Sequence, residues 1–391
     1  MTSNRPLRIA MLAHSTNPRG GVVHAMELAN ALHQLGHCPV LHAPDPSGKG
    51  FFRNVPYETV GISASPATDG LLEMVNQRVS EYISYFSRPG ATQFDIYHAQ
   101  DAISANALAT LVASGTIPAF IRTVHHIDTF ECEKLQRLHD RAITSADRIL
   151  CVSRLWLRNL SDCYGIEAEL VSNGVNTERF SPVPGEPDRT LRERLGITGT
   201  GPVFLSVGGI ESRKNSAGIL RALSQVLKEQ PQAQLVIAGG VTLLDHGQYA
   251  CEFEKAAEEL EISKGPGKQL VITGKIDDRD MPALFRAADA LVFPSLVEGF
   301  GLVVLEAMAS GTPAIVSNIA PFTEFLPEGS CLWVEPRSPE SIANAMLAAL
   351  EPGLSSKLKT AGHEVANQFS WASVAQTHSE IYSRFRLDKR D

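Results

Sequence analysis

The feature that most constrains the fold is an alternation of short apolar strands and amphipathic helices that runs through the chain twice. In the first half the strand-like segments are LRIAMLAHS, CPVLHA, DIYHAQ, AFIRTVH and DRILCVS, with helical patterns between them. The alternation starts again after Gly201 with PVFLSVGG, AQLVIAGG, QLVITGK, ADALVFPS and TPAIVS. Strands that alternate with helices form parallel sheets covered by helices. The sequence therefore predicts an α/β protein with two doubly wound parallel sheets in tandem.

The segment ERFSPVPGEPDRTLRERLG lies between the two repeats and is rich in proline and polar residues. This composition is typical of a connector, and 391 residues are enough for two domains of ordinary size. We therefore expect an N-terminal domain over residues 1–180 and a C-terminal domain over residues 181–365. Residues 366–391 belong to a helical pattern with no strand after it, and we expect this helix to pack back toward the N-terminal domain.

Composition and charge exclude several classes of protein. The formal net charge of −8 disfavours a nucleic-acid surface, which normally needs clustered Lys and Arg. The six cysteines form no CxxC pair, which argues against a zinc site and a disulfide framework. No apolar run has the ~20 residues that a membrane span needs, and no signal-peptide core is found, so a cytoplasmic protein is expected. A peripheral membrane contact through Lys134, Arg137 and Arg141 stays open but is not favoured, because the net charge opposes anionic lipid.

The segment EGFGLVVLEAMASGTPAIVS, residues 298–317, contains two carboxylates eight positions apart. Glu298 is expected at the mouth of a loop and Glu306 in the helix that begins near Leu302. Gly299 and Gly301 let the backbone approach a ligand, which the amides of the first helical turn also face. The two carboxylates are therefore placed to accept hydrogen bonds from hydroxyl groups at opposite ends of one ligand. Taken alone, such a pair is more often a solvated loop charge and a salt-bridging helix residue.

A pair of cations, Arg213 and Lys214, follows the strand VFLSVGG. Ligands of open α/β sheets lie beyond the carboxyl ends of the strands, so this loop is placed to direct the two cations at a bound diphosphate. A diphosphate leaving group gains negative charge as its bond breaks, and fixed cations stabilise that transition state. The alternative, a solvated basic loop, is the more common one when no other motif accompanies the pair.

These motifs together resemble the retaining family-4 glycosyltransferases, which use nucleotide sugars and adopt the GT-B fold of two Rossmann-like domains facing across a cleft. The resemblance covers nearly the whole chain, and it implies that the N-terminal domain lies on the acceptor side and that the C-terminal domain binds the nucleotide sugar. It is carried by FRAADALVFPS and EGFGLVVLEAMASGTPAIVS, and by Gly20-Gly21, TVHH at 123–126, VSNGVN at 171–176, GGIESRKN at 208–215 and ITGKI at 272–276. One departure is Asn176, where the family motif often has Asp.

The resemblance implies a role for each matching residue. Glu306 would bind the ribose hydroxyls, and Glu298 would lie beside the 3- and 4-hydroxyls of the sugar. His125 would contact the transferred sugar near the reaction centre. The remaining donor-binding residues would contact the phosphates, the sugar or the base, several of them through backbone groups: Gly20, Gly21, Gly208, Gly274, Lys275, Ile276, Phe300, Gly301 and Leu302.

Two further features of the first domain are weaker. His98 and Asp101, in DIYHAQD, end a strand and are candidates to line an acceptor pocket, together with loops of the segment 44–70. The string from His125 to Asp128 also looks like part of a metal site, but no second ligand pair at proper spacing accompanies it. We therefore expect no metal and no cofactor.

The sequence thus predicts transfer of a hexose from a nucleoside diphosphate sugar, such as UDP-glucose, to an unidentified hydroxyl acceptor, with retention at the anomeric carbon. His125, Arg213, Lys214 and Glu298 are the residues expected to act in the reaction. Two alternatives stay open: a GT-B sugar-nucleotide epimerase or hydrolase, and a nucleotide-sugar-binding protein without turnover. A nicotinamide dehydrogenase is disfavoured because no GxGxxG follows the first strand.

Overall fold

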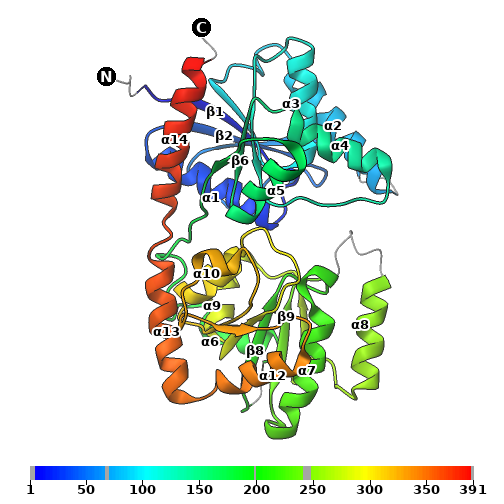
Figure 1. Cartoon of the computed structure of the whole chain (residues 1–391), viewed down its shortest axis with the longest axis vertical. Coiled ribbons are helices and arrows are strands. Elements are labelled where there is room, and N and C mark those ends of the chain that lie inside the picture. The colour runs from blue at the N-terminus through cyan, green and yellow to red at the C-terminus, as the bar shows by residue number, and fades with distance from the viewer. Residues whose placement is uncertain (1–4, 67–69, 198–199, 241–247, 389–391) are drawn as a thin grey trace. The chain divides into compact units, whose positions relative to one another are not determined.

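The computed structural model describes residues 5–66, 70–197, 200–240 and 248–388. The chain divides into two compact units, each built around one parallel sheet (Figure 1). Unit 1 comprises Met1–Gly174 together with Trp371–Asp391, and unit 2 comprises Val175–Ser370. The prediction of two doubly wound parallel α/β sheets is confirmed.

Unit 1 contains a seven-stranded sheet with the strand order β3-β2-β1-β4-β5-β6-β7. All neighbouring strands are parallel, and the central strand β1 is fully buried from Ile9 to Leu12. Continuous apolar runs suit such strands because helices cover both faces of the sheet. The strands are β1 (Arg8–Leu12), β2 (Cys38–Asp45), β3 (Glu58–Ser63), β4 (Ile96–Ala99), β5 (Ile121–Val124), β6 (Arg148–Cys151) and β7 (Glu169–Leu170).

Two helices of unit 1, α3 and α5, begin at side-chain caps that the sequence encodes. Asp101 accepts a hydrogen bond of 2.8 Å from the backbone N–H of Ser104 at the start of α3, and Ser153 caps α5 in the same way. Such caps satisfy N–H groups that have no partner inside the helix. The helices are α1 (Gly20–Gln34), α2 (Leu71–Phe86), α3 (Ala102–Ala113), α4 (Glu133–Thr144), α5 (Arg154–Tyr164) and α14 (Trp371–Asp388).

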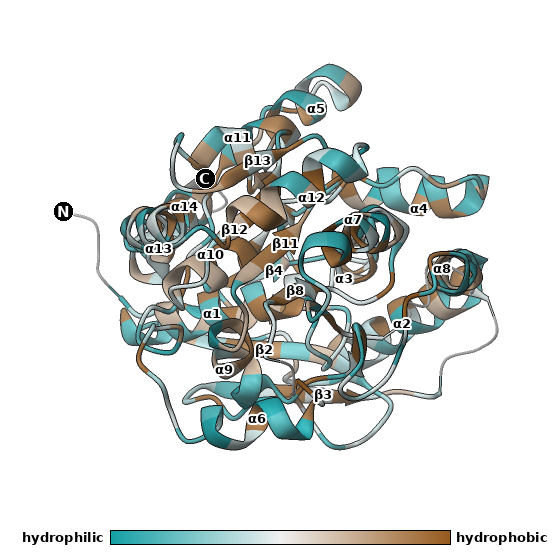
Figure 2. Cartoon of the chain, turned by 90° about the horizontal axis from the view of Figure 1, so that it is seen from below, coloured by the Kyte–Doolittle hydropathy of each residue, from teal (hydrophilic) through white to brown (hydrophobic). Residues whose placement is uncertain are grey.

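Unit 2 contains a six-stranded parallel sheet with the order β10-β9-β8-β11-β12-β13. Its inner strands are buried and largely aliphatic, and β11 and β12 are brown in the hydropathy colouring of Figure 2. The strands are β8 (Val203–Val207), β9 (Gln234–Ala238), β10 (Leu270–Gly274), β11 (Ala290–Phe293), β12 (Ala314–Ser317) and β13 (Leu332–Val334).

The helices of unit 2 cover both faces of this sheet. Aliphatic side chains of α7 and α12 pack with those of β8 and β9 in one core, which includes Leu223, Met346 and Ile237. The helices are α6 (Asp188–Arg194), α7 (Ser216–Glu229), α8 (Gln248–Glu259), α9 (Met281–Arg286), α10 (Leu302–Ala309), α11 (Phe322–Phe325), α12 (Pro339–Ala348) and α13 (Pro352–Ala366), with short 3-10 turns η1 (Ser212–Lys214) and η3 (Asp278–Asp280).

The strand orders place two loops beside each other in each unit. In unit 1 the direction of strand progression reverses between β1 and β4, and in unit 2 it reverses between β8 and β11. Loops diverge at such a switch point and leave a crevice beyond the carboxyl ends of the two strands, where open α/β sheets bind ligands. The sequence motifs that follow β1, β4, β8 and β11 are therefore at the positions where a ligand is expected.

Two expectations differ from the structure in detail. The segment 44–70 is not all loop, because Glu58–Ser63 pairs with β2 as the edge strand β3. The connector contains helix α6, which is tied to α9 by an ion pair of 2.6 Å between Asp188 and Arg286 within unit 2. The C-terminal helix α14 lies within the range 366–391 and belongs to unit 1, whereas α13 belongs to unit 2.

Helix α14 packs against α1 within unit 1. Ser379 of α14 lies 2.8 Å from the ring of His37, which follows α1, and Tyr382 of α14 is fully buried. A segment distant in the sequence thereby completes the packing of the N-terminal sheet.

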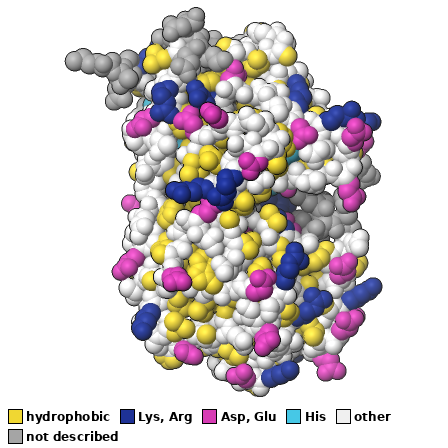
Figure 3. Space-filling model, viewed as in Figure 1, with side chains coloured by type: hydrophobic (Ala, Val, Ile, Leu, Met, Phe, Trp, Pro, Cys, Tyr) yellow, Lys and Arg dark blue, Asp and Glu magenta, His cyan; other side chains and the backbone are white. Residues whose placement is uncertain are grey.

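The surface of the described chain carries mixed charge. On the face shown in Figure 3, Lys and Arg side chains are interspersed with Asp and Glu. Within the described ranges, no helix combines the length and apolar character needed to cross a bilayer.

Candidate functional site

Three charged side chains of unit 2 meet at the switch point between β8 and β11. Lys214 Nζ lies 2.5 Å from one carboxylate oxygen of Glu298, and Arg213 Nη1 lies 2.8 Å from the other. Arg213 also donates through Nε to Glu211 at 3.2 Å. Ser295 Oγ lies 3.3 Å from Glu298 Oε2. The sequence predicted three of these residues, and the structure brings them into direct contact.

The loop after β8 needs glycine to form this cluster. Gly209 has φ +79°, and a Cβ there would lie 2.0 Å from the carbonyl oxygen of Gly240. Gly208 has φ +127°, and a Cβ there would lie 3.0 Å from the Lys214 side chain. A side chain at either position would therefore be strained and would displace its neighbours. The tight turn leads into η1, which holds both cations.

The charges of the cluster compensate each other in a buried setting. Burial would raise the pKa of Glu298, but the charges and hydrogen bonds of Lys214 and Arg213 outweigh it and lower the pKa to about 2. Burial lowers the pKa of Lys214 despite the opposing charge of Glu298. For Arg213, burial is outweighed by Glu298 and Glu211, and the pKa is raised. Glu298 is therefore an anion that holds two cations, with Lys214 also over the ring of Phe293 at 4.2 Å.

The loop after β11 leads directly into helix α10. Gly301 has φ +96°, and a Cβ there would lie 2.5 Å from the ring of Phe322. Phe300 is buried and stacks on Phe325 with ring centroids 4.5 Å apart, which fixes the loop from its inner side. Leu302 begins α10, and Glu306 lies in that helix, half-buried. Helix α10, which carries Glu306, thus begins directly after the loop that contains Glu298, and its first amides lie at the end of that loop.

The segment after β10 forms another part of this edge. Gly274 ends the strand with φ +66°, and its carbonyl oxygen accepts a hydrogen bond of 2.9 Å from the N–H of Gly239. Lys275 is exposed and Ile276 is half-buried. Because β10 is separated from β8 by β9, these residues lie further along the same edge of the sheet.

In unit 1 the predicted residues surround His125, which follows β5. A Cβ on Gly21 would lie 3.9 Å from the His125 ring, while Gly20 begins α1 with open space around it. His125 Nε2 lies 3.1 Å from Gln100 Oε1, and its ring meets that of His24 edge to face at 4.6 Å. Burial and nearby positive groups hold the pKa of His125 well below its usual range. The imidazole is therefore neutral.

The two acceptor candidates have other surroundings. His98 is fully buried, with Nδ1 2.7 Å from the hydroxyl of Tyr382 and Nε2 2.8 Å from that of Thr123. This arrangement favours a role in packing behind the site over direct contact with an acceptor. Asp101 caps α3 through one oxygen, whereas its buried Oδ2 has no hydrogen-bond partner among the described atoms.

The His-His-x-Asp string does not gather into a metal cluster. His126 Nε2 pairs with Asp128 at 3.0 Å, and both side chains are about half exposed. Within the described part of the chain, no group of three His, Cys, Asp or Glu side chains is arranged to hold a metal ion.

Sequence reasoning missed several residues that contact the predicted ones, among them Glu211, Ser295, Gln100 and Tyr382. Glu211 lies in the motif GGIESRKN and Gln100 lies in DIYHAQD, so their positions beside predicted residues could have identified both. No pattern connects Tyr382 to His98, because 284 positions separate them.

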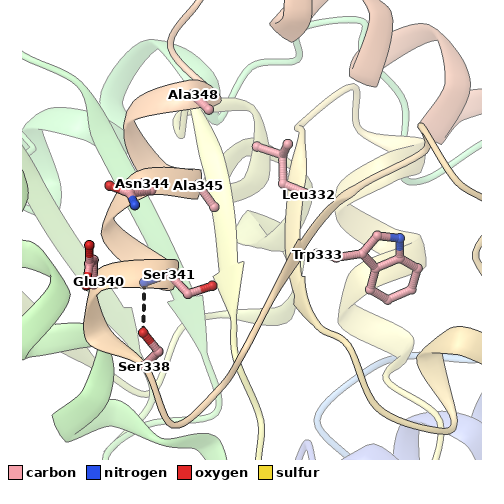
Figure 4. A pocket seen from close by; sticks show the side chains of 8 residues that line it. All are labelled: Leu332, Trp333, Ser338, Glu340, Ser341, Asn344, Ala345 and Ala348. Carbon is pink, nitrogen blue, oxygen red and sulfur yellow. Dashed lines mark hydrogen bonds between the residues drawn. The ribbon is translucent and has the colours of Figure 1, made fainter.

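A surface hollow lies elsewhere in unit 2, between β13 and α12, with Trp333, Glu340 and Asn344 in its lining (Figure 4). Ser338 and Ser341 in its wall are joined by a capping hydrogen bond of 3.1 Å. None of the predicted site residues lines this hollow, so it is not the candidate site.

Two family models match the chain. The model described as "Glycosyltransferase Family 4" matches residues 18–179, and the one described as "Glycosyl transferases group 1" matches residues 187–365. The chain belongs to this glycosyltransferase family. The resemblance seen in the sequence is thereby confirmed, and the protein is a glycosyltransferase of the retaining family 4, which transfers a sugar from a nucleotide sugar.

Individual proteins of this kind resemble the chain at moderate identity. An uncharacterized glycosyltransferase of Methanocaldococcus jannaschii is 25% identical over 308 residues, which cover 75% of this chain and 76% of the relative. Several other curated relatives are matched over only 55 to 62% of their own length.

Solved structures show the GT-B-like fold. Sucrose-phosphate synthase from Thermosynechococcus elongatus matches with a TM-score of 0.77 and 23% identity, covering 98% of this chain and 100% of that one. Anabaena HepE in complex with UDP-glucose matches with a TM-score of 0.76 and 17% identity, covering 97% of this chain and 100% of that one.

Proposed function

We propose that this glycosyltransferase moves a hexose from a UDP-hexose, such as UDP-glucose, to a hydroxyl acceptor, with retention at the anomeric carbon. The observation that supports this most is the cluster of Arg213, Lys214 and Glu298 at the switch point of unit 2. Two fixed cations beyond the carboxyl end of β8 suit a diphosphate. The choice of UDP-glucose rests on the likeness to Anabaena HepE, whose structure holds that donor.

The charged residues of unit 2 have separate roles in this reaction. Arg213 and Lys214 stabilise the negative charge that develops on the leaving diphosphate, and Glu298 holds both cations in place. Glu306 binds the ribose hydroxyls from α10, and Gly274, Lys275 and Ile276 contact the base. In unit 1, His125 contacts the transferred sugar.

A front-face reaction agrees with this assignment. A double displacement needs a free carboxylate nucleophile, whereas both oxygens of Glu298 are held by cations. In the front-face route, the bond from C1 to the phosphate oxygen breaks and the acceptor oxygen bonds to C1 on the same face. The acceptor proton passes to the departing phosphate oxygen. The protein then contributes positioning and electrostatic stabilisation.

The test is incubation of the purified protein with UDP-glucose and a cell extract, followed by mass spectrometry of the products. We expect a product heavier by one hexosyl unit, with an α-linkage by NMR because the α-configured donor is retained. Consumption of UDP-glucose without any acceptor would instead favour the epimerase or hydrolase. Donor binding without any product across a broad acceptor panel would favour a binding protein. Lys214→Met serves as the low-activity control, with product formation expected to fall on the order of 100-fold.

A further inference from the structure

The ring of His125 is held by a chain of polar contacts within unit 1. His125 Nε2 lies 3.1 Å from Gln100 Oε1, and Gln100 Nε2 lies 3.3 Å from each ring nitrogen of His98. Gln100 is only 3% exposed and His98 is fully buried. The carboxamide therefore sits between two imidazoles and has little freedom to turn.

The far end of the chain is fixed by two hydroxyl groups. His98 Nδ1 is 2.7 Å from Tyr382 of α14, and Nε2 is 2.8 Å from Thr123 of β5. Both ring nitrogens of His98 are thus engaged, so the ring cannot rotate without breaking a buried hydrogen bond. The C-terminal helix thereby contributes to the orientation of Gln100.

We propose that Gln100 is a positioning residue that holds His125 as the Nε2–H tautomer and presents its Nδ1 lone pair to a hydroxyl group of the sugar substrate. A carboxamide oxygen only accepts, so the Nε2 that faces it must carry the proton. In the neutral ring Nδ1 is then the acceptor. Nδ1 forms no hydrogen bond within the described part of the chain, and His125 keeps partial exposure. The inference rests on the proposed function, in which His125 contacts the transferred sugar.

The charges around His125 point to a hydroxyl rather than to a phosphate. The titratable groups that face it are His24 of α1, His98 of β4, the adjacent His126 and Arg122 of β5. These groups are neutral or positive, and they oppose a second positive charge on His125. A neutral imidazole lone pair repels an anion and accepts from a hydroxyl. His125 therefore accepts a hydrogen bond from a hydroxyl group of the sugar, while the cations of unit 2 bind the diphosphate.

The first test is ¹⁵N-resolved NMR of the imidazoles in the full-length protein without substrate, with His125→Asn used for assignment. We expect the Nε2–H tautomer, and an Nδ1–H tautomer would overturn the proposal. This measurement is independent of turnover, so a failure of the proposed function leaves its result intact.

The second test compares Gln100→Glu with Gln100→Leu. A carboxylate at position 100 stabilises the imidazolium, so Gln100→Glu should shift the acidic limb of the pH profile of kcat/KM upward and lower the value at neutral pH about tenfold. Gln100→Leu should populate both tautomers and lower kcat/KM without the pH shift. UDP affinity in calorimetry should stay unchanged in both, because the nucleotide contacts lie in unit 2, and a wild-type thermal unfolding curve by circular dichroism shows that unit 1 of each variant is folded. A Gln100→Glu enzyme with the wild-type pH profile would contradict the positioning role.

Discussion

Lys214 Nζ and Glu298 Oε2 lie 2.5 Å apart although 84 positions separate the two residues in the chain. The contact follows from the strand order, because β8 and β11 are neighbours and each is followed by one of the two residues. The carboxyl ends of parallel neighbours meet at one edge of the sheet, so the loops that follow them must meet as well. An ion pair distant in sequence is thus a direct product of the topology.

Replacement of either cation should slow the reaction. We expect Arg213→Ala and Lys214→Met each to lower kcat on the order of 100-fold, because a fixed charge on the leaving diphosphate is lost. The measurement is steady-state turnover of UDP-glucose with the acceptor identified from extract. The matched control is Lys228→Met, an exposed lysine in the last turn of α7, which should keep the wild-type rate. Near-normal turnover in the Lys214 variant would place the diphosphate elsewhere.

Removal of the Glu306 carboxylate should weaken nucleotide binding. Glu306→Ala loses the acceptor of two ribose hydrogen bonds, and we expect UDP to bind about 10- to 100-fold more weakly in calorimetry. Glu328→Ala changes an exposed glutamate of the same unit and should leave the affinity unchanged. Equal affinities of the Glu306 variant and the wild type would remove the ribose role.

The conformation of the loop before α10 should depend on glycine. In Gly301→Ala the new methyl group meets Phe322 at 2.5 Å in a backbone with φ +96°. We expect this change to lower the free energy of unfolding by about 2–3 kcal/mol, measured by urea denaturation. Gly353→Ala, in helix α13 with open space around it, is the matched control and should be neutral or slightly stabilising. A Gly301 variant as stable as this control would show that the loop tolerates other conformations.

Unit 1 should lose stability in mild acid because it buries neutral histidines. Burial lowers the pKa of His378 to about 4 and that of His24 to about 3, from 6.5. A histidine with a depressed pKa in the folded state binds its proton more readily when unfolded, so stability is complete above pH 6.5 and falls as the pH drops toward these values. The His378 term alone amounts to about 2 kcal/mol at pH 5.

His378→Leu should therefore flatten this pH dependence. His378 Nδ1 donates only to a backbone carbonyl of its own helix and Nε2 has no partner among the described atoms, so an apolar replacement costs little at pH 7. The measurement is urea unfolding at pH 7 and pH 5, with the exposed His33→Leu as control. A variant that loses as much stability as the wild type between these pH values would contradict the assignment.

Much of the fold could be predicted from sequence because its signals are local. The run PVFLSVGG became β8, Val203–Val207, and the run AQLVIAGG became β9, Gln234–Ala238. The edge strand β3 was missed because ETVGIS alternates only weakly and its burial is incomplete. The start of the C-terminal helix was expected at residue 366 and lies at Trp371, because NQFS contains no proline or glycine to mark the exact break.

The site was predictable where a residue type implied a chemistry, and not where a contact depended on the fold. Arg213, Lys214 and Glu298 were each named for a ligand, yet nothing in the sequence indicated that the glutamate binds both cations. His98 was expected to line an acceptor pocket because it ends a strand, but the sheet register directs its ring toward α14 and Tyr382. A side chain's direction depends on which helix covers its face of the sheet, and α14 comes from the far end of the chain.

The central claim is that unit 2 binds a nucleoside diphosphate sugar through Arg213, Lys214, Glu298 and Glu306. A crystal structure of the protein with UDP-glucose tests it most directly. We predict diphosphate oxygens within hydrogen-bond distance of Arg213 and Lys214, and the ribose hydroxyls on Glu306. A nucleotide bound elsewhere, with the Lys214–Glu298 pair out of its reach, would contradict the account.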